Sequence, residues 1–211
     1  MDTINEKQEV LHHELSEEVR QYRQAEHEID PVFLNRWSPR AFSEEPVDDE
    51  VLMSAFEAAR WAPSSNNEQP WRFIIARIAE DRQRFLEFLV PANQVWAKHA
   101  PVLLVIISKK TFSRGGAPNT VYQFDAGCAW GYIALQALQN GLITHGMAGF
   151  DNDKAREILG VPEDFDIMAV IAIGKRGDKS ELPENLQERE IPSGRRPLSE
   201  TIVEGGFRKD S

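Results

Sequence analysis

The most informative stretch of the sequence is residues 62–73, Ala62-Pro-Ser-Ser-Asn-Asn67-Glu-Gln-Pro-Trp71-Arg-Phe73. It follows a predicted helix that begins near Pro46, with Asp48 or Asp49 as its N-cap, and it leads into a strand predicted from Trp71 to Arg77. Proline, serine and asparagine end helices and form turns, but hydroxyl and amide groups in a loop also bind ligands. The stretch therefore indicates a polar helix-to-strand connection in a mixed α and β fold.

Helical and strand patterns alternate downstream of this stretch. In chain order the sequence predicts helix 79–89, strand 101–108, helix 122–140, a short strand or turn at 143–150, helix 153–159, strand 166–174 and an edge strand at 198–203. The apolar run 101–108 is typical of a strand buried on both faces. Apolar and small residues surround the helix 122–140, so we expect it at the centre of a domain or of a dimer. The pattern favours an α+β fold.

The N-terminal residues 1–29 are predicted to form an amphipathic helical extension. Its apolar stripe consists of Leu11, Leu15, Val19 and Tyr22, and Asp30-Pro31 is expected to end it. Nothing in composition marks a further boundary, so residues 30–211 are predicted to form one domain, with 176–197 as a loop or extended arm.

Charge and composition exclude several classes of protein. The 211 residues include 24 lysines and arginines against 34 aspartates and glutamates, a net charge of −10, which argues against nucleic-acid binding and against a polybasic membrane anchor. The longest apolar run, 100–107, is too short to span a membrane. A single cysteine, Cys128, and a polar, acidic N-terminus fit a cytoplasmic protein, and no metal site is predicted.

Basic side chains recur in loops of this acidic protein. Arg36, Ser38 and Arg40 alternate, so in an extended segment they point to one side and form a clamp for an anion. A second basic pair, Arg195-Arg196, lies near the C-terminus. The sequence holds no G-x-G-x-x-G, no Walker A and no G-x-S-x-G motif.

Four blocks together resemble the FMN-dependent nitroreductase family. They are Arg36-Trp37-Ser38-Pro-Arg40, Pro63-Ser-Ser-Asn-Asn67-Glu-Gln-Pro-Trp71, Gly146-Met-Ala-Gly149-Phe-Asp151 and Arg195-Arg-Pro-Leu198. The second block is specific, and the order and spacing of all four match over roughly residues 30–205. The resemblance implies a three-layer fold, with a mostly antiparallel central sheet flanked by helices, in an intertwined homodimer with FMN at the subunit interface. It implies NADH or NADPH as the electron donor and a small electrophile, such as a nitroaromatic or a quinone, as the substrate.

The resemblance also implies a set of FMN contacts. Arg36 and Ser38, with Trp37 between them, would bind the phosphate together with Arg195 and Arg196, and Arg40 would stabilise negative charge on the reduced ring. Asn93 would pair with the pyrimidine edge, and Met147, Ala148 and Gly149 would lie near N5. Pro63, Ser64, Ser65 and Asn67 would come from the other subunit. No catalytic side chain is predicted, because the flavin carries hydride in a ping-pong reaction.

Two positions depart from the family pattern. Ala148 stands where many members carry an acidic residue, and Trp96, which also fits a place in the core, stands where some carry lysine. The substrate therefore stays open. The same fold and flavin could serve dehalogenation, enone reduction or dehydrogenation. A non-catalytic flavin-binding protein, with the N-terminal helix as a docking element, is the third alternative.

Overall fold

A four-stranded sheet lies at the centre of the computed structural model, which describes residues 14–207. All of its neighbouring strands are antiparallel. Their order across the sheet is β1 (Trp71–Ala76), β2 (Val102–Lys109), β4 (Phe165–Gly174) and β3 (Ile143–Met147). The strands predicted at 71–77, 101–108 and 166–174 are therefore confirmed to within one residue at each end, and the strand predicted at 143–150 ends three residues early. Among the described residues the outer edges of the sheet belong to β1 and β3.

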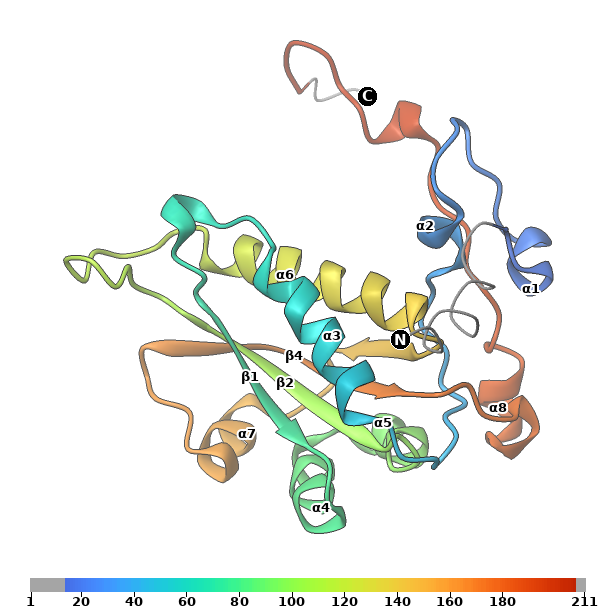
Figure 1. Cartoon of the computed structure of the whole chain (residues 1–211), viewed down its shortest axis with the longest axis horizontal. Helices are drawn as coiled ribbons and strands as arrows, with labels where there is room; N and C mark the ends of the chain where they lie inside the picture. Colours follow the sequence, from blue (N-terminus) through green and yellow to red (C-terminus); the bar gives the residue numbers. More distant parts are fainter. Residues whose placement is uncertain (1–13, 208–211) are drawn as a thin grey trace, which may run out of the picture.

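Helices cover both faces of this sheet (Figure 1). One face carries α3 (Asp49–Arg60) and α6 (Tyr122–Gln139), and the other carries α4 (Ala79–Phe88), α5 (Pro91–Ala97) and α7 (Asn152–Leu159). The predicted three-layer α+β fold is confirmed. None of the helices in the described residues is long and apolar enough to cross a membrane.

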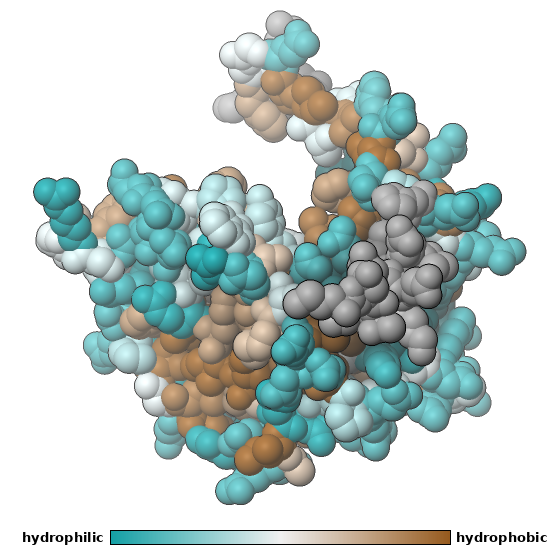
Figure 2. All heavy atoms as spheres, in the orientation of Figure 1, coloured by the Kyte–Doolittle hydropathy of each residue, from teal (hydrophilic) through white to brown (hydrophobic). Residues whose placement is uncertain are grey.

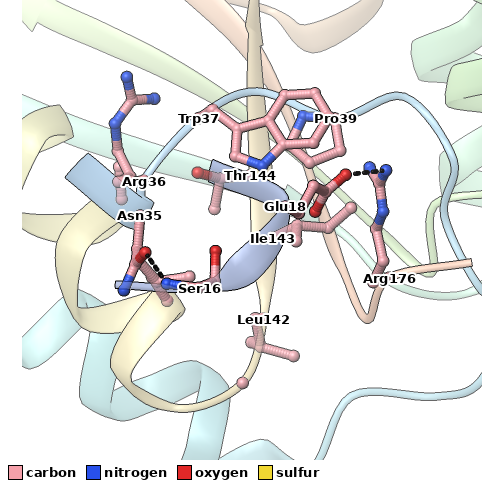
Figure 3. A pocket seen from close by; sticks show the side chains of 13 residues that line it. Ser16, Glu18, Asn35, Arg36, Trp37, Pro39, Leu142, Ile143, Thr144 and Arg176 are labelled. Atoms are coloured by element: carbon pink, nitrogen blue, oxygen red, sulfur yellow. Dashed lines mark hydrogen bonds and ion pairs between the residues drawn. The ribbon is translucent and has the colours of Figure 1, made fainter. Parts of the chain in front are cut away.

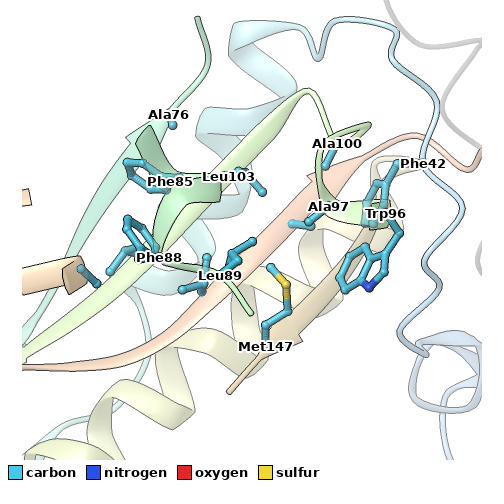
Figure 4. Packing of buried hydrophobic residues seen from close by; sticks show 14 of the residues in the cluster. Phe42, Ala76, Phe85, Phe88, Leu89, Trp96, Ala97, Ala100, Leu103 and Met147 are labelled. Atoms are coloured by element: carbon cyan, nitrogen blue, oxygen red, sulfur yellow. The ribbon is translucent and has the colours of Figure 1, made fainter. Parts of the chain in front are cut away.

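The strand β2 explains why there are two apolar cores. Successive side chains of a strand point to opposite faces, so a strand that is apolar throughout packs on both sides. Val102, Leu104 and Ile106 pack with α3 and α6. Leu103 and Val105 join the other cluster, in which Figure 4 shows Phe85, Phe88, Trp96 and Met147 together.

Local capping sets the ends of the main helices as expected. The Asp48 side chain accepts hydrogen bonds from the backbone of Glu50 and Val51 and starts α3. Gly141, with φ of +74°, follows the end of α6 in the left-handed region that glycine adopts easily. Asp151 caps α7 in the same way as Asp48 caps α3.

Three local predictions are wrong. Asp30-Pro31 does not end the helix before it, since α1 ends at Arg20, but begins another helix, α2 (Pro31–Asn35), because the Asp30 side chain caps it and proline suits the first helical position. The short helix α5 was not expected. The segment 198–203 is not an edge strand: it forms a 3₁₀ turn, Leu198–Glu200, because none of the strands in residues 14–207 pairs with it. The remaining short elements are α8 (Glu184–Gln187) and the 3₁₀ turns Ser65–Asn67 and Lys179–Glu181.

The predicted N-terminal amphipathic helix is also wrong for the described residues 14–29, where only α1 (Glu17–Arg20) is helical. A longer helix would bury little more apolar surface here, since Val19 is buried but Tyr22 is 42% exposed. The backbone instead makes tertiary contacts, such as the hydrogen bond from the Ser16 N–H to Asn35 Oδ1 (2.9 Å). Leu11 lies outside the described residues, and the domain boundary at 29/30 stays a prediction.

Two apolar surfaces are left uncovered in the single chain. Phe124 on α6 is 79% exposed, so the expectation that α6 is buried on all sides does not hold within one chain. The C-terminal arm, residues 191–207, runs away from the body of the molecule (Figure 1), and brown apolar surface lies along it in Figure 2. Its exposed apolar residues include Ile202 and Phe207.

Candidate functional site

A cavity of about 280 Å³ lies where the segment 36–40 meets the start of the C-terminal arm. Arg36, Ser38 and Arg40 all line it, as their alternation in the sequence predicts, and Arg36 Nη1 donates a hydrogen bond to Ser38 Oγ (3.3 Å). Arg195 lines the same cavity. The full set of lining residues is Arg23, Arg36, Trp37, Ser38, Arg40, His145, Arg189, Ile191, Ser193 and Arg195. We call this cavity the anion pocket.

Positive charge accumulates in the anion pocket. Five of its lining residues are arginines, and no acidic residue from the described part of the chain lines it. Burial lowers the pKa of Arg23 to about 10, with Arg195 and Arg36 adding to the shift. The pKa of Arg36 is lowered by burial and then by Arg195. A bound dianion would stabilise guanidinium groups that lie this close together, because charge-assisted hydrogen bonds from arginine to phosphate are strong and often bidentate.

One buried carboxylate holds the segment 36–41 in place. Glu190, whose side chain is fully buried, accepts hydrogen bonds at Oε1 from the backbone N–H groups of Arg40 (2.7 Å) and Ala41 (2.9 Å). The same oxygen accepts one from Arg176 Nη1 (2.7 Å). Burial lowers the pKa of Arg40, Glu190 opposes that shift, and Arg189 adds to it. Glu190 therefore fixes the backbone beside the anion pocket and partly balances the charge of Arg40.

Replacing Glu190 with alanine is expected to destabilise the protein by about 3–5 kcal/mol, because it leaves buried N–H donors and the Arg176 charge without their acceptor. Urea unfolding measures this loss. Glu190→Gln keeps one acceptor oxygen and is expected to lose less. The exposed neighbour Glu188 gives the matched control, Glu188→Ala, which should change the unfolding free energy by less than about 0.5 kcal/mol. Equal effects of the two alanine variants would contradict this role of Glu190.

Two residues predicted to contact FMN, Asn93 on α5 and Gly149 just after β3, also lie close together. Asn93 Nδ2 donates to the carbonyl oxygen of Gly149 (3.0 Å), and a Cβ atom on Gly149 would lie 2.8 Å from that nitrogen. A larger residue at 149 would therefore have to displace the side chains of Asn93 and Val90. Met147 is buried in the core, whereas Ala148 is exposed.

His145 connects this group to the anion pocket. Its Nδ1 lies 3.0 Å from the carbonyl oxygen of Pro39, and its ring lies 4.5 Å from that of Trp96. Burial lowers the pKa of His145, which keeps the ring neutral at pH 7. Trp96 is 1% exposed and also stacks on Phe42, so it belongs to the core.

A second cavity, of about 260 Å³, is lined by Arg36, Trp37 and Pro39 of the same segment (Figure 3). Arg36 and Trp37 line both cavities, and the Trp37 ring stacks against the guanidinium of Arg176 at 4.8 Å. Arg176 also pairs with Glu18 (3.3 Å), which Figure 3 shows at the rim. The walls are otherwise largely apolar, with Leu138 and Leu142 among them.

The predicted site residues of the helix-to-strand loop lie elsewhere. The backbone N–H of Ser65 donates to the Asp125 carboxylate (3.1 Å) at the start of α6, whereas Leu138 near the end of α6 lines the cavity beside Arg36. Those thirteen residues of helix span roughly 20 Å. Pro63, Ser64, Ser65 and Asn67 are therefore not brought together with Arg36 within one chain.

The backbone of this loop is unusual. Asn66, Asn67 and Gln69 have φ values of +52°, +55° and +50°, in the left-handed region that residues other than glycine seldom adopt. Ser64 Oγ accepts a hydrogen bond from the Gln69 N–H (3.0 Å), and Gln69 Nε2 donates to Asn67 Oδ1 (3.0 Å). Strained backbone of this kind is found most often at functional sites.

The structure places one predicted site residue outside the anion pocket and adds residues to the site that the sequence does not predict. Arg196 is exposed and lines a different cavity, beside Tyr22 and Phe33, so its predicted contact stays a prediction. Arg23, Arg189 and Glu190 are not predicted from the sequence, because Arg23 lies in a polar segment and the other two lie in a run of charged residues, both of which are typical of solvated surface. No local signal in the sequence marks them.

Comparison with known proteins points to one family. The sequence model of the Nitroreductase family matches residues 34–95 and 89–175. A solved structure described as an oxidoreductase containing FMN is 47% identical, with a TM-score of 0.84, over 88% of this chain and 96% of that one. An FMN-dependent nitroreductase from Clostridium difficile is 28% identical, with a TM-score of 0.58, over 71% of this chain and 92% of that one. An NADH dehydrogenase from Thermus thermophilus is 26% identical over 201 residues, 81% of this chain and 92% of that protein.

Proposed function

The chain belongs to the nitroreductase family, and from that premise we propose that it is an FMN-dependent oxidoreductase that uses NAD(P)H to reduce a small electrophile such as a nitroaromatic or a quinone. The observation that carries this proposal is the anion pocket, with its five arginines and no carboxylate among the described lining residues. A pocket of this chemistry fits the phosphate of FMN.

The pocket residues fit FMN in distinct ways. When bound, FMN would supply the two-electron redox chemistry that links NAD(P)H to the substrate. Arg36, Ser38 and Arg195 would hold the phosphate, since they surround one cavity. Arg40 would place a fixed positive charge beside the ring, and Glu190 holds its backbone there.

A complete site requires a second copy of the chain. Ser65 binds Asp125 at the start of α6, about 20 Å along that helix from Leu138, which lines the cavity that Arg36 of the same chain also lines. The neighbouring Pro63, Ser64 and Asn67 belong to the same loop. A symmetric dimer in which α6 packs against its partner would bring the loop of one subunit to the pocket of the other. The polar loop and its left-handed backbone then belong to the cofactor site.

The uncovered apolar surfaces support the homodimer. Phe124 and Tyr132 are exposed on one side of α6, and a Cβ atom added to Gly127 or Gly131 would meet nothing within 4 Å, which leaves room for another helix. The outer edge of β1 is unpaired, and the C-terminal arm carries exposed Ile202 and Val203. An arm of this kind suits an exchange between subunits.

Two half-reactions measured separately test the proposed reaction. The FMN-loaded protein, mixed with NADH or NADPH without oxygen, is expected to lose the yellow absorbance of the oxidised flavin. Mixing the reduced protein with a quinone or a nitroaromatic after removing the nucleotide should restore that absorbance. Reduction by NAD(P)H without reoxidation by any such electrophile would leave the flavin site intact and overturn the proposed substrate class.

The cytoplasmic location stays a prediction, which the single cysteine, Cys128, fits.

A further inference from the structure

The N-terminal segment contributes one nearly buried arginine to the anion pocket. Arg23 is 8% exposed, and its guanidinium donates to three backbone carbonyl oxygens. Nη1 donates to Leu34 (2.6 Å) and to Arg36 (2.8 Å), and Nε donates to Ser193 (2.8 Å). One side chain therefore joins three segments that are far apart in the sequence.

These carbonyl groups belong to the two segments that carry the other cations. Leu34 and Arg36 belong to the helix α2 and the strand-like segment after it, whereas Ser193 is two residues before Arg195. Arg195 and Arg36 repel each other, and Arg195 contributes to the lowered pKa of Arg36. The arrangement therefore needs attachments that hold the two guanidinium groups close together.

The C-terminal arm has few such attachments. Within residues 14–207, the hydrogen bonds that leave residues 191–207 go only to Arg23 and Glu26. The second of these joins the Leu198 N–H to Glu26 Oε1 (3.1 Å). Both partners belong to the N-terminal segment. The residues from Ser193 to Val203 are all exposed, so side-chain packing within the chain does not fix the arm.

We propose that Arg23 is a positioning residue of the cofactor site, which holds Arg195 on the C-terminal arm against Arg36 so that both cations reach one phosphate. The identity of that phosphate, as part of FMN, rests on the proposed function. The N-terminal segment is then a working part of the site and not a docking element for another protein.

The fork of the guanidinium distinguishes positioning from simple charge. Arg23 uses two nitrogens to reach three carbonyl groups in fixed directions, which one ammonium group on a flexible stem does not reproduce. Arg23→Lys keeps the charge and removes the fork, whereas Arg23→Met removes both. If Arg23 acts by positioning, the two variants should therefore lose FMN affinity to a similar extent.

The experiment compares FMN with riboflavin, which lacks only the phosphate, by fluorescence titration of the full-length protein. Wild type is expected to bind FMN more tightly. Arg23→Met and Arg23→Lys should each weaken FMN binding at least about tenfold and change riboflavin binding less than about twofold. Arg20→Met is the matched control, because Arg20 lies on the same segment, is exposed and donates only locally to Leu15. It should bind both ligands as wild type does.

Each other outcome contradicts a specific part of the proposal. Wild-type FMN affinity in Arg23→Lys would make Arg23 a simple charge, and equal weakening of FMN and riboflavin would make it a general stabiliser of the fold. If Arg23→Met does not fold, Arg23→Lys alone decides between these roles. Failure of the proposed function is distinct from all of these, because wild type itself would then show no preference for FMN over riboflavin.

Discussion

Replacing Arg36 with alanine is expected to weaken FMN binding by roughly 10- to 100-fold. Arg36 lines the anion pocket, where it donates a hydrogen bond to Ser38 and is close enough to Arg195 for that residue to lower its pKa. A hydrogen bond to a charged group contributes about 1.5–3 kcal/mol, and a guanidinium often makes two such bonds to one phosphate. Quenching of flavin fluorescence at a fixed salt concentration measures the dissociation constant.

The same substitution should leave the protein without cofactor at least as stable as before. Burial and Arg195 lower the pKa of Arg36, which means that the charged form of the side chain is destabilised when no anion is present. Arg84→Ala is the control and should bind FMN normally, because Arg84 is an exposed residue of α4 that does not line the anion pocket. An Arg36→Ala protein with wild-type affinity for FMN would show that the phosphate binds elsewhere.

Replacing Gly131 with arginine is expected to separate the dimer and remove FMN at the same time. Gly131 lies on α6 beside the exposed Tyr132, and a Cβ atom added there would meet nothing within 4 Å, so the single chain leaves room for a side chain to begin at this position. In a symmetric dimer each subunit would bury one unpaired charge, at about 3–5 kcal/mol per charge. The dimer dissociation constant should therefore rise at least about 1,000-fold.

Analytical ultracentrifugation and the flavin content of the same sample measure both effects. The variant should sediment as a 24.0 kDa monomer and carry little FMN, because the residues 63–67 of one chain no longer meet the pocket of the other. Gln83→Arg on the exposed side of α4 is the matched control and should remain dimeric. A Gly131→Arg protein that stays dimeric and yellow would place the interface away from α6.

Much of the fold could be predicted because its signals are local. The uninterrupted apolar run at 101–108 identifies a strand buried on both faces, and Asp48 and Gly141 mark the ends of two helices. The alternation of Arg36, Ser38 and Arg40 predicted a one-sided cationic group, and all three line one cavity.

The predictions that failed depend on contacts between distant segments. Residues 14–29 hold an amphipathic pattern but form only one helical turn, because Ser16 and Arg23 bond to residues 34–36 and 193. Glu190 looks like a surface carboxylate in its sequence, and only the fold shows that it is buried beneath Arg40. A run of charged residues does not indicate which of its side chains will be buried in the fold.

The visible spectrum of the purified protein, recorded without oxygen before and after addition of NADH or NADPH, tests the central claim most directly. We predict a yellow protein with bound FMN that bleaches on addition of at least one of the two nucleotides. A colourless protein that does not take up added FMN would contradict the assignment of the pocket formed by Arg36, Ser38, Arg40 and Arg195 as a cofactor site.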